Sequence, residues 1–392
     1  MSHLMNTYGR QPITFTHGEG VWLWDKAGNK YLDALAGVAV NGLGHAHPKL
    51  TKAVSEQAAK LIHVSNIYHI AEQEALADKL AEISGMDKVF FCNSGCEANE
   101  AAIKLARLYG HNKGISNPEI IVMERAFHGR TMATLSATGN RKTQAGFEPL
   151  VSGFIRVPYD DLEAVKQIAT RKNNVVAILV EPVQGEGGVY IPADMRAYLE
   201  GLRKVCDDNA WLLMLDEVQS GIGRTGTWFA FQHTGMTPDV MTLAKGLGSG
   251  VPIGACIAKG VAAEVFTLGK HGSTFGGNPL ATMAGLTTLN AIQDEKLREN
   301  AQKMGDLIVS QLKTALNGVT GVAVIRNAGL MIGIELDRPC AELVKMALED
   351  KLLINVTAEK VVRLLPPLVI SEAEANELAT RLSALIKQFL SQ

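Results

Sequence analysis

The chain of 392 residues lacks most features that mark membrane or secreted proteins. Its five cysteines are odd in number and scattered, which argues against a disulfide framework and favours a reducing compartment. No apolar run reaches the length of a transmembrane helix, and residues 1–10 lack the apolar core of a signal peptide. We therefore expect a cytoplasmic protein without a membrane segment.

An excess of charge of one sign is also lacking. Lysine and arginine number 38 and aspartate and glutamate 40, so the net charge of −2 gives no electrostatic reason to expect nucleic acid as a partner. No metal site is indicated, because Cys92 and Cys96 lack zinc-site spacing and the His-Ala-His segment 45–47 has no third ligand. We expect this segment to form a turn before Pro48. No G-x-G-x-x-G is placed between a predicted strand and helix, which argues against a dinucleotide-binding dehydrogenase.

The middle of the chain alternates short apolar runs with helical patterns. The runs are continuous rather than alternating, as expected for strands buried on both faces, and several gaps leave room for a crossover helix. This pattern predicts an α/β fold with a mostly parallel sheet. The six predicted strands are Val89–Cys92, Ile120–Met123, Val175–Val180, Trp211–Leu215, Val240–Leu243 and Ala255–Ala258.

The two flanks of the chain look different from its middle. Residues 15–35 are predicted to form two strands around a glycine turn, and the chain after about residue 290 is rich in helical patterns. Strand-like pieces stand near Gly321–Ile325, Met331–Leu336 and Val362–Leu365. The length suggests two or three domains. We predict a large cofactor domain over residues 59–290, and a smaller α+β domain built from residues 1–58 and 291–392.

Two charged residues stand at the ends of neighbouring predicted strands. Lys245 follows one strand and precedes a glycine-rich turn, and Asp216 follows another. A lysine in such a place can form a Schiff base with a carbonyl group. An aspartate nearby can hold a proton on a ring nitrogen, and the two together are the signature of pyridoxal phosphate. Functional groups are expected at these carboxyl ends of the sheet.

Four further segments suit the same cofactor. Residues 93–97 place capping-box spacing at a helix start, where free N–H groups can bind a phosphate. Phe127 can stack on a planar ring, and Arg130 can hold a carboxylate. Glu186 stands in a glycine-rich loop and is interpreted as a partner for an arginine; Arg363 is one candidate, although the sequence does not pair them. Residues 271–279 place hydroxyls among glycines and suit a second phosphate contact.

The motifs in these segments identify a resemblance. The chain resembles the class III (ornithine-type, subgroup II) aminotransferases of fold type I, from about Tyr8 to the last helix. Its most specific segments are N-S-G-C-E-A-N-E-A (93–101), F-H-G-R-T (127–131), E-P-V-Q-G-E-G-G (181–188), L-D-E-V-Q-S-G-I-G-R-T-G (215–226), A-K-G-L-G (244–248) and G-S-T-F-G-G-N-P (272–279).

The resemblance implies a role for each residue around pyridoxal phosphate. Lys245 would carry the cofactor as an aldimine and then move the proton, and Asp216 would bind the pyridine nitrogen. The remaining cofactor contacts implied are Gly95 and Cys96 at the phosphate, Phe127 and Val218 on the two ring faces, Gln219 at the phenolic oxygen, Glu217, and Thr274 from the neighbouring subunit of a homodimer. Cys96 departs from the usual threonine or other small residue, so a hydroxyl contact would be lost and sensitivity to oxidation gained.

The resemblance also implies the substrates. In the branch that the chain resembles most, N2-acetylornithine gives its δ-amino group to 2-oxoglutarate in a ping-pong reaction. Arg130 and Ser273 would contact the substrate, and Arg363 would take the α-carboxylate of glutamate, with Glu186 masking it at other times. The sequence leaves other donors open: succinylornithine, ornithine, succinyldiaminopimelate and 4-aminobutyrate. It also leaves open aminomutase or racemase chemistry, or a non-catalytic protein that has kept the fold.

Overall fold

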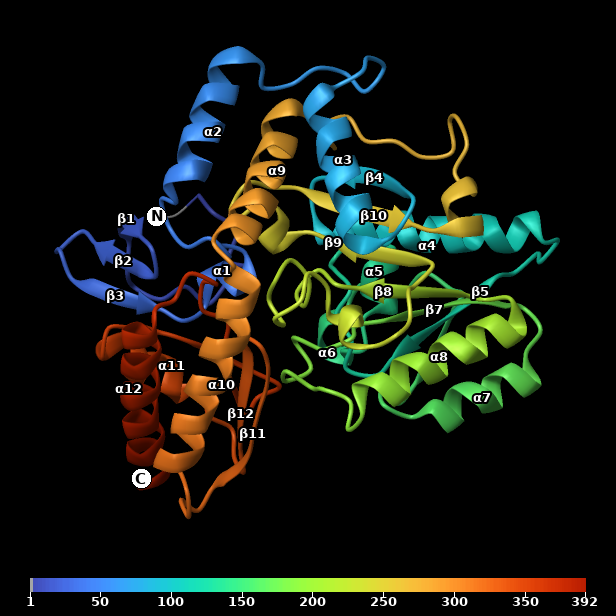
Figure 1. Ribbon diagram of the computed structural model, residues 1–392. Coiled ribbons are helices and arrows are strands. Elements are labelled where there is room, and N and C mark those ends of the chain that lie inside the picture. Colours follow the sequence, from blue (N-terminus) through green and yellow to red (C-terminus); the bar gives the residue numbers. More distant parts are fainter. Residues whose placement is uncertain (1–2) are drawn as a thin grey trace.

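The centre of the molecule is a seven-stranded sheet, seen in a computed structural model that describes residues 3–392 (Figure 1). Met1 and Ser2, at the start of the segment predicted over residues 1–58, lie outside the described residues. The strand order is β4-β10-β9-β8-β7-β5-β6, with β10 alone antiparallel to its neighbours. The strands are β4 (Lys88–Cys92), β5 (Glu119–Met123), β6 (Phe154–Val157), β7 (Val175–Val180), β8 (Leu212–Asp216), β9 (Val240–Leu243) and β10 (Gly254–Ala258).

All six strands predicted from apolar runs are present, and the α/β prediction with a mostly parallel sheet is confirmed. The sequence missed only β6 of this sheet. This strand lies at the sheet edge and three of its four residues are incompletely buried, so it does not form a continuous apolar run.

Both faces of the sheet are covered, which explains the continuous apolar runs. In β8, Leu213 and Leu215 point into one core, and Leu212 and Met214 into another, because successive side chains alternate across a strand. Helices α7 (Leu162–Arg171) and α8 (Met195–Asn209) cover the first face, and α4 (Gly95–Asn112) covers the second (Figure 1).

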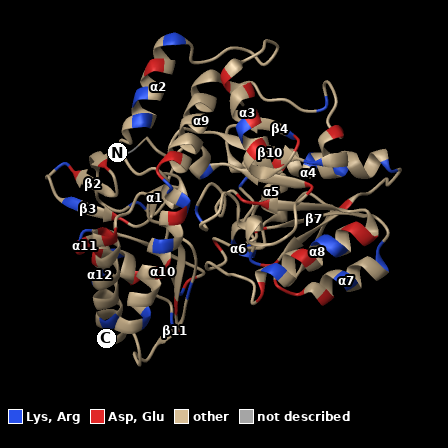
Figure 2. Ribbon diagram, in the orientation of Figure 1, with Lys and Arg blue, Asp and Glu red and all other residues tan. Residues whose placement is uncertain are grey.

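Charges of both signs are interspersed along the surface helices (Figure 2). In α8 they form ion pairs four residues apart, Arg203 with Asp207 and Lys204 with Asp208. Such pairs add only about 0.2–0.5 kcal/mol each to helix stability. The helix is therefore held mainly by its buried face, which includes Leu199 and Leu202.

Two smaller sheets flank the central one. Strands β1 (Phe15–Glu19), β2 (Trp22–Asp25) and β3 (Lys30–Asp33) are antiparallel, and β13 (Leu352–Leu353) joins β3 in parallel. The other sheet has the order β11 (Val322–Ala328), β12 (Met331–Leu336), β15 (Val361–Leu364) and β14 (Asn355–Thr357). The N-terminal strands thus share a sheet with a strand from near the other end of the chain.

The remaining helices pack around these sheets. They are α1 (Ala36–Ala39), α2 (Pro48–Lys60), α3 (Ala71–Ser84), α5 (Met132–Ala137), α6 (Arg141–Gln144), α9 (Pro279–Asp294), α10 (Leu297–Ala315), α11 (Glu342–Glu349) and α12 (Glu372–Leu390), with 3-10 helices at Ala230–His233, Lys245–Leu247 and Gly260–Glu264. The predicted domain boundary near residue 58 falls inside α2, which packs against α9. The domain boundary stays a prediction.

The turn predicted at residues 45–47 is present. Ala46 has a φ of 52°, and His47 immediately precedes α2, which has Pro48 in its first turn. Each histidine contacts a different carboxylate: His45 Nε2 lies 2.8 Å from Asp33 Oδ2, and His47 Nε2 lies 3.2 Å from Glu295 Oε2. Residues 3–392 contain no group of three or more candidate metal ligands. Across the same range, no helix has the length and apolar character needed to cross a membrane.

Candidate active site

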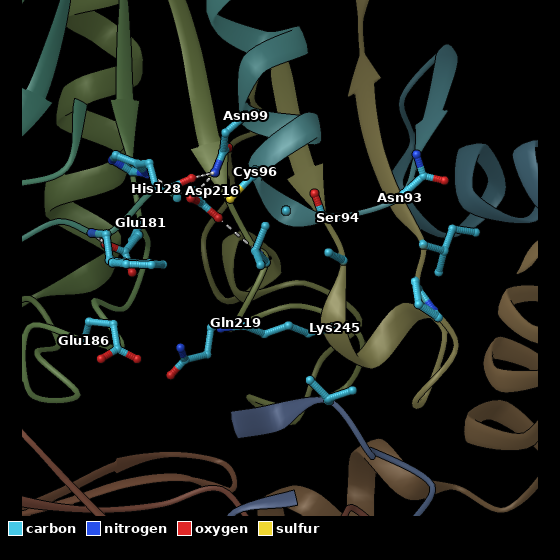
Figure 3. Close-up of a pocket in the computed structure, with 18 of the residues that line it drawn as sticks. Asn93, Ser94, Cys96, Asn99, His128, Glu181, Glu186, Asp216, Gln219 and Lys245 are labelled. Atoms are coloured by element: carbon cyan, nitrogen blue, oxygen red, sulfur yellow. Dashed lines mark hydrogen bonds and ion pairs between the residues drawn. The ribbon is translucent and has the colours of Figure 1, made fainter. Parts of the chain in front are cut away.

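A cavity of about 320 Å³ opens at the carboxyl ends of the central strands (Figure 3). The residues that line it come from segments far apart in the sequence. Eight of the predicted site residues are among them: Gly95, Cys96, Phe127, Glu186, Asp216, Val218, Gln219 and Lys245. These predicted residues therefore gather at this edge of the sheet.

Lys245 follows β9 and begins a short 3-10 helix. Its φ of 42° is rare for a residue with a side chain, and such conformations often mark functional sites. Burial, helped by the positive charge of Arg363, lowers the pKa of Lys245 to about 8. A lysine amine of this kind is partly neutral near physiological pH and can act as a nucleophile.

This shift predicts the pH dependence of carbonyl capture by Lys245. A lysine with a pKa of about 8 is roughly 10% neutral at pH 7, against roughly 0.03% for a lysine at 10.5. Capture of pyridoxal phosphate by the apoprotein, trapped with borohydride and measured by mass spectrometry, should therefore reach half its maximum near pH 8. Exposed lysines in the same digest, such as Lys52, provide the control. A midpoint for Lys245 above pH 10 would contradict the assignment.

Asp216, the last residue of β8, is held by three donors or polar neighbours. Its Oδ2 accepts a hydrogen bond from Asn99 Nδ2 at 2.7 Å and lies 2.8 Å from His128 Nδ1. Its Oδ1 accepts from the Val218 backbone N–H at 3.0 Å. The carboxylate is thus fixed in direction, with Figure 3 showing it between α4 and the His128 loop.

Asn99 and His128 were not predicted as site residues. Asn99 lies in the otherwise apolar buried stripe of α4, and a buried polar residue requires a partner. This isolated asparagine is the signal that was available in the sequence. Its Oδ1 accepts from the Thr242 hydroxyl at 2.7 Å, which fixes the orientation of its amide. The buried Nε2 of His128 has no partner in the described structure.

The start of α4 also lines the cavity, through Ser94, Gly95 and Cys96. Ser94 accepts the Glu97 backbone N–H at 3.2 Å, and the Glu97 carboxylate accepts the Asn93 backbone N–H at 2.8 Å, much as capping-box spacing predicts. A Cβ atom on Gly95 would stand 2.8 Å from a Val218 methyl group, so only glycine allows this close approach. The free N–H groups of a helix start favour a phosphate.

These elements fit pyridoxal phosphate in three independent respects. The cavity provides a lysine amine of lowered pKa, a buried aspartate and a helix N-terminus. When bound, the cofactor supplies an aldehyde for amine exchange and a ring that withdraws electrons. Lys245, Asp216 and the start of α4 would hold its aldehyde, ring nitrogen and phosphate.

Cys96 lies at this phosphate end. Its Sγ accepts the Arg130 backbone N–H at 3.2 Å and lies close to Gly129. Replacing Cys96 with serine should tighten cofactor binding by about threefold to tenfold, because a hydroxyl forms a stronger hydrogen bond worth about 1 kcal/mol. Titration of the apoproteins with pyridoxal phosphate measures this, with the buried Cys340→Ser variant as control. Unchanged or weaker binding would show that the thiol of Cys96 does not lower the affinity for the cofactor.

Arg363 and Glu186 form the ion pair that the sequence left open. Arg363 Nη1 lies 2.8 Å from Glu186 Oε1 and donates to Gln219 Oε1 at 3.2 Å, while its Nε donates to Asn355. The arginine is 1% exposed. Although burial opposes ionisation of Glu186, the nearby guanidinium holds the pKa of this carboxyl below its usual value.

Arg130 lies further out. Its guanidinium stands 5.4 Å from the Phe127 ring centroid, and it lines a second cavity of about 680 Å³. Phe127 and Glu186 line both cavities, so the two are adjoining chambers. The first is the inner cavity and the second the outer chamber.

Glu217 does not line either cavity. Its carboxylate accepts the Ala230 and Phe231 backbone N–H groups at 2.8 and 2.9 Å and the Ser220 hydroxyl at 2.8 Å. Burial raises its pKa to about 7. This position corrects the expectation of a cofactor contact: adjacent residues at a strand end point in opposite directions, so Glu217 faces away from Asp216 and holds the following loop.

Ser273 and Thr274 lie outside the inner cavity. Ser273 Oγ accepts the Gly276 backbone N–H at 2.9 Å and lies 3.4 Å from Asn93 Nδ2. Thr274 is exposed and lines a separate hollow with residues 63–67. Within one chain neither residue reaches the cofactor site, and their predicted roles stay predictions.

The G-x-G-x-x-G spacing does occur, over residues 221–226. This segment forms turns and leads into a 3-10 helix at Ala230–His233. It lacks the α-helix start on which a dinucleotide pyrophosphate rests. These glycines therefore do not form a dinucleotide-binding turn.

The family model for class III aminotransferases matches residues 5–386, and the chain belongs to this family of pyridoxal-phosphate-dependent enzymes. It is 64% identical over 390 residues to the acetylornithine aminotransferase of Nitrosomonas europaea, covering 100% of this chain and 99% of the relative. It is 57% identical over 391 residues to acetylornithine aminotransferase 1 of Bordetella bronchiseptica, with 100% and 99% covered.

Solved structures show the same fold. An acetylornithine aminotransferase from Elizabethkingia anophelis has a TM-score of 0.87 and 36% identity, covering 99% of this chain and 97% of that one. An ornithine aminotransferase from Toxoplasma gondii, with partial occupancy of pyridoxal phosphate at its active site, has a TM-score of 0.95 and 33% identity, covering 100% and 93%. These likenesses support the predicted fold type and cofactor.

Proposed function

We propose that the enzyme transfers the δ-amino group of N2-acetylornithine to 2-oxoglutarate, giving N-acetylglutamate 5-semialdehyde and glutamate, as a step of arginine biosynthesis. The observation that carries this proposal is the Glu186–Arg363 pair, in which Glu186 lines the same cavity as Lys245 and Asp216 and Arg363 lies directly behind it, bonded to Gln219. The 64% identity to an acetylornithine aminotransferase supports the choice of donor.

Lys245 and Asp216 would do the chemical work. The neutral amine of Lys245 is suited to remove a proton from the substrate and return it at another atom. Asp216, fixed by Asn99 and the Val218 N–H, would keep the facing ring nitrogen protonated. The two half-reactions then share one set of groups, as covalent exchange requires.

The Glu186–Arg363 pair would let one site accept two substrates. The main chain around Glu186 is fastened, because its carbonyl accepts the Thr357 hydroxyl at 2.6 Å and Arg326 donates to the Gly188 carbonyl at 2.6 Å. The side chain itself is half exposed and pairs with Arg363. Rotation of this side chain would free Arg363 for the α-carboxylate of glutamate or 2-oxoglutarate without moving the loop.

Masking of Arg363 by Glu186 predicts how Glu186→Gln changes the rates of the two half-reactions. With Arg363 no longer neutralised, the half-reaction with N-acetylornithine should slow by about tenfold or more, since one charge-assisted contact is worth about 1.5–3 kcal/mol. The half-reaction with glutamate should be kept or improved. Rapid-mixing measurement of each half-reaction tests this, with Glu359→Gln in the outer chamber as a matched control. Equal slowing of both half-reactions would argue against masking.

The proposed function is tested by product stoichiometry. Holoenzyme mixed with N-acetylornithine alone should form one equivalent of semialdehyde per site and then stop. Addition of 2-oxoglutarate should start steady turnover and yield glutamate. Repeated turnover without an oxo acid would indicate aminomutase or racemase chemistry, and no product would exclude this donor.

A second donor is favoured by one observation. Ornithine aminotransferases from Toxoplasma gondii share the fold at a TM-score of 0.95, although at 33% identity. Comparison of kcat/KM for N-acetylornithine, ornithine, succinylornithine, succinyldiaminopimelate and 4-aminobutyrate ranks the donors. A higher value for ornithine would replace the first proposal.

We further propose a homodimer that completes each active site with Thr274 of its neighbour. Exposed apolar side chains surround this residue: Ile67, Tyr68 and Phe275 are 80%, 64% and 62% exposed. Asn66 donates to the Ser273 and Gly276 carbonyls and so fixes the loop. Light scattering combined with cofactor titration tests the proposal. A monomer that binds pyridoxal phosphate tightly would rule it out.

We also propose that the enzyme is located in the cytoplasm. All five cysteines are unpaired, which supports a reducing cytoplasm. Titration of the denatured, unreduced protein as isolated should therefore find five free thiols per chain. A lower count would indicate a disulfide and a different compartment.

A further inference from the structure

Glu181 is a buried acid for which the mechanism above has no use. It directly follows β7, is 5% exposed, and lines the inner cavity between the His128 loop and Glu186 (Figure 3). Burial raises the pKa of Glu181 to about 7, so its ionised form is costly to keep there. A residue of this kind calls for a reason beyond filling space.

The two carboxylate oxygens of Glu181 bind two different segments. Oε1 accepts the Phe127 backbone N–H at 2.9 Å, and Oε2 accepts the Gly185 backbone N–H at 3.1 Å. Phe127 lies in the loop after β5, the strand next to β7. One side chain therefore joins the loops that leave two neighbouring strands.

The loop after β5 carries Arg130, and the loop after β7 carries Glu186, the partner of Arg363. The Phe127 ring lies under the Arg130 guanidinium, 5.4 Å away. Gly185 directly precedes Glu186, which pairs with Arg363 at 2.8 Å. Rotation of Glu186 would leave Arg363 held by Gln219 and Asn355, so the arginine stays in place beside this loop. The Glu181 carboxylate thus ties the loop that carries Arg130 to the loop that lies beside Arg363.

We propose that Glu181 is a positioning residue that fixes the separation of Arg130 and Arg363, and thereby sets the chain length of the dicarboxylate that the enzyme accepts. The substrate named in this inference rests on the proposed function, whereas the hydrogen bonds of Glu181 do not depend on it. A dicarboxylate held at both ends is sensitive to this separation, since a misplacement of about 1 Å can cost about 10²-fold in rate.

The main chain at Glu181 is also held by a side chain that does not contact the carboxylate. Removing this contact shows what loosening of the loop does by itself. The Tyr159 hydroxyl lies 3.0 Å from the Glu181 carbonyl and 2.9 Å from the Pro182 carbonyl. These contacts hold the start of the loop without involving the carboxylate. Tyr159→Phe is therefore the matched control, because it loosens the same loop and leaves both ties of Glu181 intact.

The test uses Glu181→Gln in the holoenzyme. An amide has one acceptor oxygen, and its NH2 group would face an N–H donor, so one of the two ties must be lost. Hydrogen exchange in peptides covering residues 125–130 and 184–188 should become at least about tenfold faster in one of them, in line with the loss of one buried hydrogen bond. The preference for 2-oxoglutarate over the four- and six-carbon 2-oxo dicarboxylates should fall about fivefold or more, which is part of the roughly 10–200-fold that one methylene can be worth.

The outcomes separate the alternatives. Wild-type exchange and a wild-type chain-length profile in Glu181→Gln would overturn the inference, and so would a profile that changes equally in Tyr159→Phe. If Glu181→Gln fails to fold, Glu181→Asp keeps the charge, shortens the reach and should give the same two changes. If the wild type uses no oxo acid, the proposed function fails, and unchanged exchange in the variant would then overturn the positioning role independently.

Discussion

The Lys245→Ala variant is expected to lose transamination by at least about 10⁴-fold, the upper range for a positioned acid–base group. Among the residues that line the inner cavity, Lys245 alone offers an amine of lowered pKa to a carbonyl and to a substrate proton. Its left-handed backbone also fixes where the amine points. Both roles end when the side chain is cut back to a methyl group. Single-turnover rates with N-acetylornithine measure the loss.

Two further measurements show whether the loss is chemical. Cofactor added to Lys245→Ala should no longer be fixed to the protein by borohydride, although it should still bind at the start of α4. Small primary amines in the buffer should restore part of the rate, because they replace the missing base without the missing attachment. Lys259→Ala, just beyond β10, is the control lysine and should behave as wild type. Substantial turnover by Lys245→Ala without added amine would refute the assignment.

Asp216→Asn should lower kcat by about 10²–10⁴-fold, the range of a proton-holding group, and leave the fold intact. The substitution keeps the size of the side chain but removes its negative charge, so a facing ring nitrogen would lose its proton. The amide also cannot accept from both Asn99 and His128 if its nitrogen replaces Oδ2. Steady-state rates and the bound cofactor per chain are the two measurements.

The control for Asp216→Asn is a carboxylate outside the cavity. Asp239 directly precedes β9 and pairs with Arg203 at 2.6 Å, so Asp239→Asn should affect stability more than rate. A near-normal kcat in Asp216→Asn, or an equal fall in Asp239→Asn, would contradict the proposed role of Asp216.

The central sheet could be predicted because burial on both faces leaves a direct record in the sequence. Strands such as β7 are entirely apolar, whereas the half-exposed edge strand β6 is not and was missed. The ends of these strands also located Asp216 and Lys245. Side-chain direction is harder to predict: the alternation that points Asp216 into the cavity turns its neighbour Glu217 away from it.

Contacts between distant segments could not be predicted in the same way. The Glu186–Arg363 pair joins the loop after β7 to strand β15, and a single sequence contains no information on which arginine faces which acid. Asn99 and His128 meet Asp216 for the same reason, through packing of α4 and a loop on the strand ends. The predicted role of Thr274 supposes a neighbouring chain and stays a prediction.

The pairing of β3 with β13 has a consequence for biosynthesis of the protein. One edge of β3 pairs with β2, but its other edge finds a partner only at Leu352 and Leu353. In a nascent chain this edge therefore stays unpaired until nearly all of the chain has left the ribosome. The central sheet can form earlier, because its last strand ends at Ala258. Domains emerging during synthesis generally fold as units. The cofactor pocket would then take shape before Arg363 arrives, and recognition of the dicarboxylate would be the last function that the growing chain acquires.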